Sequence, residues 1–591
     1  MISRKLSFIA VVTIVLLAAC GKKAPSYTKY IPKGSPNVIS IDVKSMLTKL
    51  NSDSLTVENM LSVIKDTANP DEYVMAMTKY KELKDAGIDW ESKVYIATSA
   101  MDIMGYNKPD VEIVAATKDA AKLEDYLKKQ PGMSEIKKGD GYSYGSNEDM
   151  AIGWNSEAVM MVFSGNKKRF NTFQDDDNSD KSKPKSEATL SGAAGKIKTY
   201  FALSKSESIL SVDGFNDVQG KPADIAIFNQ ANLDGINAMA FAFLPKLKEL
   251  IEGTYSATTI NFENGKAVIE TKGAVGKKMG EILKKYAGPE VDLSMIENYP
   301  SQNIDGAVVF SFKPELIPAI IRETGVDALL SLGLAQTGMG LDDFSKVFKG
   351  DFAVVVSDFA VNREEAGKDA EIYSREKPVA KMIFAAKIGD KAAFDKLVNF
   401  AVKTGSVIRS GDMLIPAEDG HPAPEMPFAI STANNMLTFA SDSATLVAYQ
   451  SKSQKAGIPD DIKSKLKGSA VGAFINIEKI LQGISTEIFD SSDMAPKNIL
   501  AKAKTTFKSG WITSANFDGK AVTGKGELLF ADATKNSLVQ LVRFSMYATE
   551  ETRAESERNR KKWDEESKTT VTVTDAVPPP PPPPAPAPKR K

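Results

Sequence analysis

Apolar and polar residues alternate along many short stretches of this chain, and several of these stretches end in a helical pattern. Residues 38–47, "VISIDVKSML", alternate as a half-buried strand does and become helix-like at Lys44. Residues 307–316, "AVVFSFKPEL", repeat this change of period, and the two segments follow tyrosine-containing leaders that begin at Tyr30 and Tyr299. The pattern therefore predicts two related strand-to-helix units in different halves of the chain.

A second matching pair of segments supports this interpretation. Residues 111–127 and 381–398 each combine an apolar strand with a helix whose apolar residues recur at helical spacing. Asp119 and Asp390 lie between strand and helix, where a carboxylate accepts hydrogen bonds from the exposed amides of a first helical turn. Four further residues are predicted to lie at similar junctions: Asp42, Asn229, Ser311 and Asn476.

Each half also ends in a predicted hairpin. Residues 258–273 and 512–530 share Asn-Phe, an acidic residue and Gly-Lys-Ala, followed by an alternating strand. The turns Asn264-Gly265 and Asp518-Gly519 favour tight hairpins, because Gly and Asn readily adopt positive φ.

Together these parallels predict an α+β fold with two tandem copies of one unit, residues 28–290 and 295–548. Each unit is expected to contain antiparallel sheets of short strands, with helices covering one face. The second sheet face is the natural place for a binding surface.

The chain after residue 548 has a different composition. Residues 549–577 are highly charged and predict a solvated helix or a linker, and residues 578–591 form a proline-rich tail. Pro578 to Pro588 predict a stiff polyproline II rod of about 3.1 Å per residue. The rod ends in a basic tip that is suited to an anionic partner: Lys589, Arg590 and Lys591.

The N-terminus has the pattern of an export signal. Residues 1–19 contain Arg4 and Lys5, an apolar run too short to span a bilayer, and small residues before Cys20, the one cysteine in 591 residues. The sequence "LAAC" resembles the lipobox of bacterial lipoproteins, which implies that Cys20 is acylated and that residues 20–27 tether the body to a membrane.

The same resemblance implies an address in the cell envelope. Gly21 after the cysteine is similar to an outer-membrane sorting signal. Lys22 and Lys23 replace the acidic residues that accompany surface export in Bacteroidetes-type lipoproteins, so the periplasmic face is favoured over the cell surface.

Composition argues against several chemistries. The chain has one histidine, His421, in a loop rich in Pro and Gly, whereas Ser-His-Asp and Cys-His mechanisms need a histidine base. Catalytic zinc, heme and iron–sulfur sites need His or Cys ligands that this chain lacks. We therefore predict no cofactor and no metal. A hydrolase that uses two carboxylates about 5 to 10 Å apart stays open, because the chain has 76 acids.

Two weaker motifs and the net charge argue against further kinds of site. Residues 192–199, "GAAGKIKT", lack the spacing and hydroxyl residue of a phosphate loop. Asp175, Asp177 and Ser179 lack the Gly and distal Glu of a calcium loop. The formal net charge of −1 provides no overall basic field, so no nucleic-acid partner is expected.

The lipobox, the leader from Tyr30, the strand at residues 38–47 and the two-copy layout resemble an uncharacterised outer-membrane lipoprotein family of Bacteroidetes, a domain of unknown function. This resemblance implies no catalytic residues. The sequence thus predicts a membrane-anchored, non-catalytic binding or scaffold protein that reaches another envelope protein or the cell wall through its tail. The alternatives are a carrier for an apolar or amphipathic envelope molecule and a carboxylate-dependent hydrolase.

Overall fold

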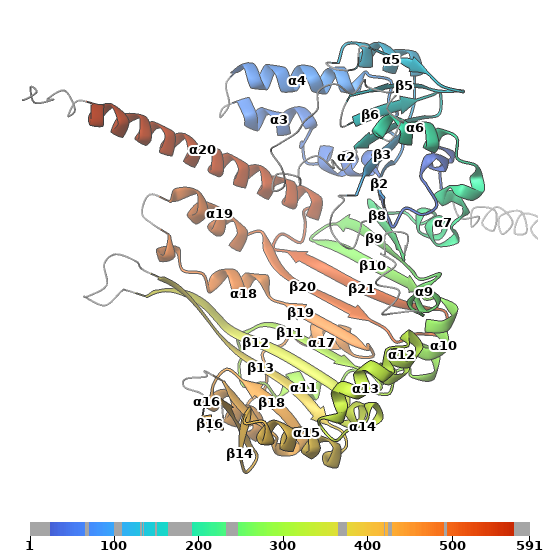
Figure 1. Cartoon of the computed structure of the whole chain (residues 1–591). Helices are drawn as coiled ribbons and strands as arrows, with labels where there is room; N and C mark the ends of the chain where they lie inside the picture. Colours follow the sequence, from blue (N-terminus) through green and yellow to red (C-terminus); the bar gives the residue numbers. More distant parts are fainter. Residues whose placement is uncertain are drawn as a thin grey trace, which may run out of the picture.

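The alternating segments pair into one antiparallel sheet that extends through both halves of the chain (Figure 1). The fold is α+β, as predicted. The structure is a computed structural model, and the residues that it describes are 24–65, 70–99, 109–130, 133, 135–147, 150–163, 192–231, 246–364, 375–418, 420–422, 428–489 and 493–571.

The strands of each half lie next to one another in this sheet. In spatial order, the first half contributes β4 (Lys137–Lys138), β5 (Ser143–Ser146), β6 (Met150–Trp154), β7 (Ala158–Phe163), β3 (Val111–Ala116), β2 (Val94–Thr98), β1 (Asn37–Ile41), β8 (Ile225–Gln230), β9 (Tyr255–Glu263) and β10 (Lys266–Ala274). The second half continues with β21 (Ala521–Phe530), β20 (Phe507–Ser514), β19 (Val471–Ile475), β11 (Ile304–Ser311), β12 (Phe348–Glu364), β13 (Arg375–Ile388), β18 (Met436–Ala440), β17 (Ala429–Ser431), β15 (Met413–Glu418) and β14 (Val407–Ser410). The short β16 (His421–Pro422) pairs with β15.

The order of strands is the same in both halves when it is followed outward from the β10–β21 pair. If β16 is set aside, each half places its last three strands first, then its first three, and then its remaining four in reverse. At the junction, Ala267 lies opposite Leu528 and Ala274 lies opposite Ala521, so the corresponding strands of the two halves pair antiparallel. This arrangement supports the interpretation of two copies, which stays a prediction.

Helices lie on both sides of this sheet. In the first half they are α2 (Val43–Asn51), α3 (Val57–Lys65), α4 (Pro70–Lys84), α5 (Ala120–Lys128), α6 (Ala193–Phe201), α7 (Asp213–Gln219), α9 (Leu247–Ile251) and α10 (Lys277–Lys285), with 3₁₀ turns at Ser26–Tyr30, Lys205–Glu207 and Ile209–Ser211. In the second half they are α11 (Ser294–Glu297), α12 (Leu316–Thr324), α13 (Asp327–Ala335), α14 (Leu341–Lys346), α15 (Lys391–Lys403), α16 (Ser443–Ser451), α17 (Asp460–Leu466), α18 (Ile477–Gln482), α19 (Met494–Lys504) and α20 (Ser537–Val571), with 3₁₀ turns at Ala433–Asn435 and Thr486–Ile488.

Most of the predicted helix starts are confirmed. Asp42 accepts a hydrogen bond from the backbone N–H of Ser45 at 2.8 Å, and Asp119, Asp390 and Asn476 cap α5, α15 and α18 in the same way. The prediction is wrong for the other two residues. Asn229 lies inside β8, and the Ser311 hydroxyl donates to Asp351 at 2.7 Å instead of capping a helix.

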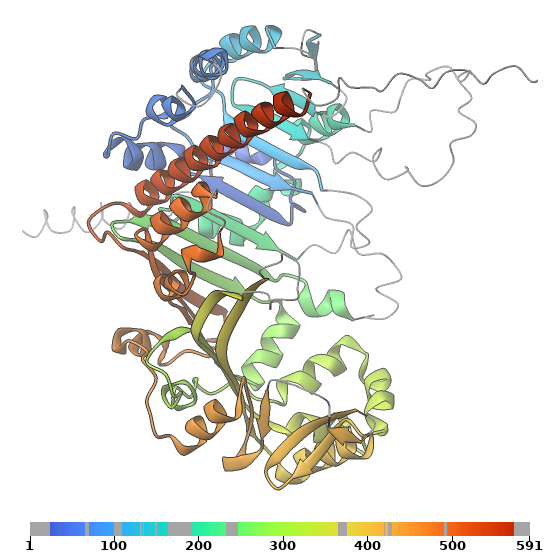
Figure 2. The ribbon, with the colours of Figure 1, turned by 90° about the vertical axis from the view of Figure 1, so that its left-hand side faces the viewer.

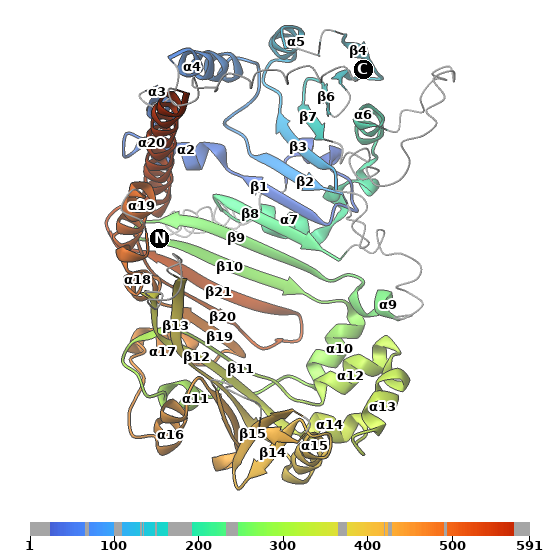
Figure 3. The same ribbon diagram turned by 60° about the vertical axis from the view of Figure 1, so that its left-hand side comes forward.

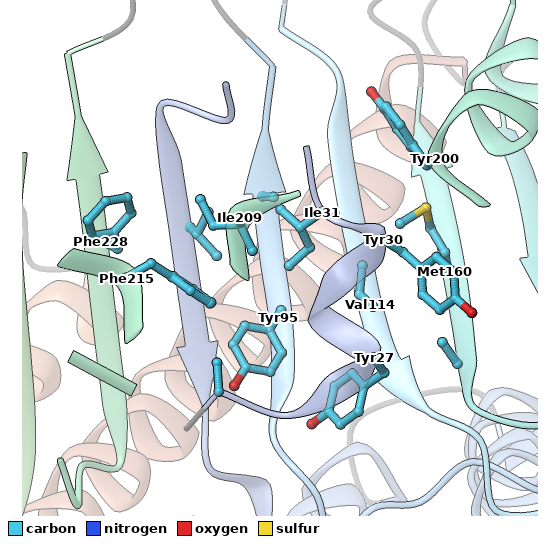
Figure 4. Close-up of a cluster of buried hydrophobic side chains, with 14 of the residues drawn as sticks. Tyr27, Tyr30, Ile31, Tyr95, Val114, Met160, Tyr200, Ile209, Phe215 and Phe228 are labelled. Atoms are coloured by element: carbon cyan, nitrogen blue, oxygen red, sulfur yellow. The ribbon is translucent and has the colours of Figure 1, made fainter. Parts of the chain in front are cut away.

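One face of the sheet, which we call the rear face, carries Val38, Ala307 and Val355 and is closed by helices. In the first half, α6, α7 and the turn at Ser26–Tyr30 cover a core that includes Tyr95 and Phe228 (Figure 4). In the second half, α11, α16 and α17 cover the core that includes Ala307 and Val355.

The opposite face, which we call the groove face, is covered only in part. Helix α5 packs near one end of the sheet and α15 near the other, while α2 and the start of α20 pack close to the junction of the halves. Helices were expected to cover one face of the sheet, whereas the structure has helices on both faces. The sequence alternates less strictly than that expectation requires, because β12 contains three consecutive valines, Val354 to Val356.

Helices also line the ends of the central strands. Figure 3 shows α18, α19 and α20 along one end, and α10, α12 and α13 along the opposite end. Helix α20 contacts α2, α3 and α19 and continues through residues 549–567 without a break (Figure 2). The central strands of the second half therefore lie between helices at both of their ends.

Candidate functional site

A continuous row of apolar residues crosses the groove face. Directly paired residues of antiparallel strands project to the same side, so the pairing register defines the row. From β18 to β2 it consists of Phe439, Phe384, Val354, Val308, Ala473, Ile512, Gly526, Ile269, Ile260, Ile225, Ile41 and Val94. No polar side chain interrupts it. The two halves thus share one apolar surface.

This surface is hollowed where the helices leave it uncovered. A groove of about 730 Å³ lies over β11, β12, β19, β20 and β21, with Ile480 of α18 on its wall. Three of the lining side chains are substantially exposed: Val308 (39%), Ile475 (45%) and Ile512 (55%). The volume lies within the range of about 300–1,000 Å³ that is usual for small-molecule sites.

Glycine creates part of the hollow. Gly510 lies directly between Ile475 and Leu528 in the pairing register. Its φ is not positive, so the backbone there does not require glycine. A Cβ at this position would lie 3.5 Å from its nearest neighbours, which is ordinary contact. The missing side chain therefore provides space and does not relieve strain.

Asp305 is a polar exception in the lining. It occupies a bulge at the start of β11 and is only 2% exposed. Its Oδ2 accepts the backbone N–H of Phe359 at 2.7 Å, while its Oδ1 is buried without a hydrogen-bond partner among the described residues. Burial, reinforced by the nearby Asp358, raises the pKa of this carboxyl group above its usual value.

Glu527 is the other acid among the residues around the groove, but its side chain projects to the rear face, because it pairs with Trp511 and, through Trp511 and Phe474, lies in line with Ala307. It accepts hydrogen bonds from Lys266 at 2.6 Å, Trp511 at 3.0 Å and Lys465 at 3.2 Å. Burial alone would raise its pKa, but these three donors hold the pKa below its usual value. Lys266 belongs to the first half and Glu527 to the second, so this carboxylate also ties the halves together.

The described lining of the groove contains none of the predicted site residues. Cys20 and the tail residues Pro578, Pro588, Lys589, Arg590 and Lys591 lie outside the described residues, as does the calcium-like segment at 175–179. His421 is exposed on β16. Lys196 of the "GAAGKIKT" segment lies inside α6 and pairs with Asp110.

Metal clusters and membrane-spanning helices are absent from the part of the chain that the structure describes. Across these ranges, no three His, Cys, Asp or Glu side chains gather as metal ligands would. Within the same ranges, none of the helices combines the length and apolar character needed to cross a bilayer.

The sequence reasoning missed the groove residues. The Met-rich apolar segments 158–163 and 237–244 would suit an adaptable lining, but Met160 is buried in the rear-face core and residues 237–244 lie outside the described ranges. A usable signal was present in "VVFS", "AVVV" and "SGWITS", where apolar residues occupy both strand faces and a glycine interrupts a strand.

These observations describe an α+β protein whose candidate site is an apolar groove on a sheet, with no cluster of reactive side chains among its lining. Residues 27–287 match the model of a family described as "Domain of unknown function (DUF4836)". The predicted domain of unknown function is thereby confirmed for the first half. The lipoprotein type and the Bacteroidetes origin stay predictions.

Other comparisons add little. No curated protein matches this chain. Among solved structures, crystal form III of TP0453 is 10% identical, with a TM-score of 0.23 over 43% of this chain and 81% of that chain. Crystal form I of TP0453 gives a TM-score of 0.22 at the same identity, over 43% of this chain and 80% of that chain.

Proposed function

We propose that this protein is a membrane-anchored, non-catalytic lipoprotein of the cell envelope that binds the apolar part of an amphiphile in the groove. The observation that carries the proposal is the open, almost wholly apolar hollow on a sheet face that is otherwise covered by helices. Acylated Cys20 provides the anchor, and the outer membrane with its periplasmic face is the favoured address.

The physics of the groove favours a hydrocarbon chain as its occupant. Exposed apolar patches of this kind on soluble bodies mark binding sites. Each methylene removed from water contributes about 0.8 kcal/mol, so about ten methylenes contribute about 8 kcal/mol before the costs of association. That gain is sufficient for useful affinity without a single hydrogen bond in the groove.

A probe-binding experiment tests the proposal. The unacylated chain from Gly21 onward is titrated with a dansyl-labelled undecanoic acid, whose fluorescence rises in an apolar site. This chain retains every described residue, because the described fold begins at Ala24. We expect saturable binding, and we expect Gly510→Phe to weaken it at least tenfold, because the phenyl ring fills the hollow.

The matched control is Gly273→Phe. Gly273 lies on β10 outside the groove, and a Cβ there would lie 3.7 Å from its nearest neighbour. This variant should bind the probe as the unsubstituted chain does. Equal binding by all three proteins would refute the groove as the site. If Gly510→Phe alone weakens binding, native mass spectrometry of the protein from its host should identify the natural amphiphile as an adduct that is absent from Gly510→Phe.

A further inference from the structure

Helix α13 is an apolar helix that the described residues leave uncovered. Its sequence, "DALLSLGLA", contains one charged residue, Asp327, and none of its nine residues is buried. Leu329 and Leu332 are 64% and 72% exposed, and Leu330 is 41% exposed. A helix that is apolar on all sides is normally enclosed by protein or by lipid. This helix therefore indicates a partner.

Basic residues lie close to this helix. Helix α12 packs against α13 on one side and against α10 on the other. Helix α10, "KKMGEILKK", carries four exposed lysines: Lys277, Lys278, Lys284 and Lys285. The apolar helix and the basic helix thus lie at the same end of the central strands, as Figure 3 shows.

The acids near α13 and α10 offset only part of this positive charge, since four lysines against one exposed acid, Glu281, leave α10 with a net charge of +3. Glu323 pairs with Lys278 at 3.8 Å, Asp342 with Arg322 at 2.6 Å, and Asp343 with Lys396 at 3.8 Å. Three exposed lysines of α10 lie at the same end of the central strands as the leucines and are not paired with these acids: Lys277, Lys284 and Lys285. A surface that combines exposed leucines with lysines is complementary to a bilayer that contains anionic lipids.

We propose that α13 and α10 together form a docking surface for an anionic lipid bilayer. The leucines enter the interface between headgroups and acyl chains, and the lysines contact the phosphate groups. Nine residues rise about 14 Å, which is too short to span the bilayer, so α13 lies in the membrane plane. This docking does not rest on the groove or on its ligand. It orients the protein on the membrane to which the predicted anchor would hold it.

Vesicle flotation with the unacylated chain from Gly21 onward tests the proposal. The vesicles consist of phosphatidylethanolamine with phosphatidylglycerol, or of phosphatidylcholine alone. We expect the chain to float with the anionic vesicles and to be released by high salt. Leu329→Gln/Leu332→Gln should lower the partition coefficient at least tenfold, because two leucines no longer enter the interface. Lys284→Gln/Lys285→Gln should lower it on anionic vesicles alone.

Matched variants separate docking from other effects. Val447→Gln changes a residue on α16 that is 64% exposed, and it should float like the unsubstituted chain. Gly510→Phe should also float, so a failure of the groove is distinguishable from a failure of docking. Flotation that the leucine variant leaves unchanged overturns the proposal. Absence of flotation by the unsubstituted chain also overturns it. If that chain is a dimer that the leucine variant converts to a monomer, α13 is assigned to contact with a second copy.

Discussion

Replacing Asp305 by asparagine should stabilise the protein at pH 8. The carboxylate is 2% exposed, its Oδ1 lacks a partner among the described residues, and its Oδ2 holds the Phe359 N–H. A buried polar atom without a partner costs about 1–3 kcal/mol, and more when it is charged. Asparagine retains an oxygen for Phe359 and removes the charge. We therefore expect the free energy of unfolding to rise by about 1 kcal/mol.

The effect has a defined pH dependence. An aspartate in the unfolded chain titrates near pH 4, whereas burial raises the pKa of Asp305 in the folded protein. The folded state thus binds its proton more tightly, and the unsubstituted protein loses stability as the pH rises from about 4 through the folded pKa. The advantage of Asp305→Asn should be small near pH 4 and should reach its full value above the folded pKa.

Urea unfolding of both proteins at several pH values between 4 and 8 measures this difference. Glu527→Gln provides a control of opposite sign on the rear face of the same sheet, because hydrogen bonds hold the pKa of Glu527 below its usual value. That variant should be less stable at pH 8, and its deficit should persist down to the usual pKa of a glutamate, about 4.3, and shrink only below it, toward the lowered folded pKa. An Asp305→Asn advantage that is equal at pH 4 and pH 8, or a variant less stable at pH 8, would refute the reasoning.

Two further predictions concern the body and the tail. Asp224 is 1% exposed and forms an ion pair with Lys49. Its carboxylate also accepts hydrogen bonds from the Ser45 hydroxyl and from the backbone N–H of Phe262, each at 2.7 Å. Asp224→Ala should therefore lower the free energy of unfolding in urea by about 3–5 kcal/mol, whereas the exposed Asp217→Ala should change it by less than about 0.5 kcal/mol. Removal of residues 572–591 leaves the described part of α20 intact and should abolish capture of envelope partners, and identical partner lists with and without the tail would contradict its proposed role.

The sequence predicted local features of the fold well. The strand starting at Val111 and its capping Asp119, and the hairpin turn at Gly265, depend on neighbouring residues that are visible in the chain. The pairing of β10 with β21 joins segments that are far apart in the sequence, and no local period encodes it. The continuous sheet could therefore not be derived from alternation alone.

The groove was harder to predict for a related reason. Val354, Val355 and Val356 read as one apolar run, but Val355 is buried on the rear face while the other two line the groove. Only the positions of α5, α15 and α20 decide which part of the groove face stays open. Apolar residues alone do not distinguish a site from a core, because both need the same side chains.

The pairing of β10 with β21 has a consequence for assembly. A chain that ended after α10 would leave the nine residues of β10 as an unpaired edge, and such edges attract other strands. Since the corresponding strands of the two halves meet antiparallel, two such shorter chains could satisfy this edge by forming a symmetric homodimer across β10. Its formation would depend on protein concentration. By carrying both halves in one polypeptide, this protein makes the seam intramolecular and holds it closed at any dilution.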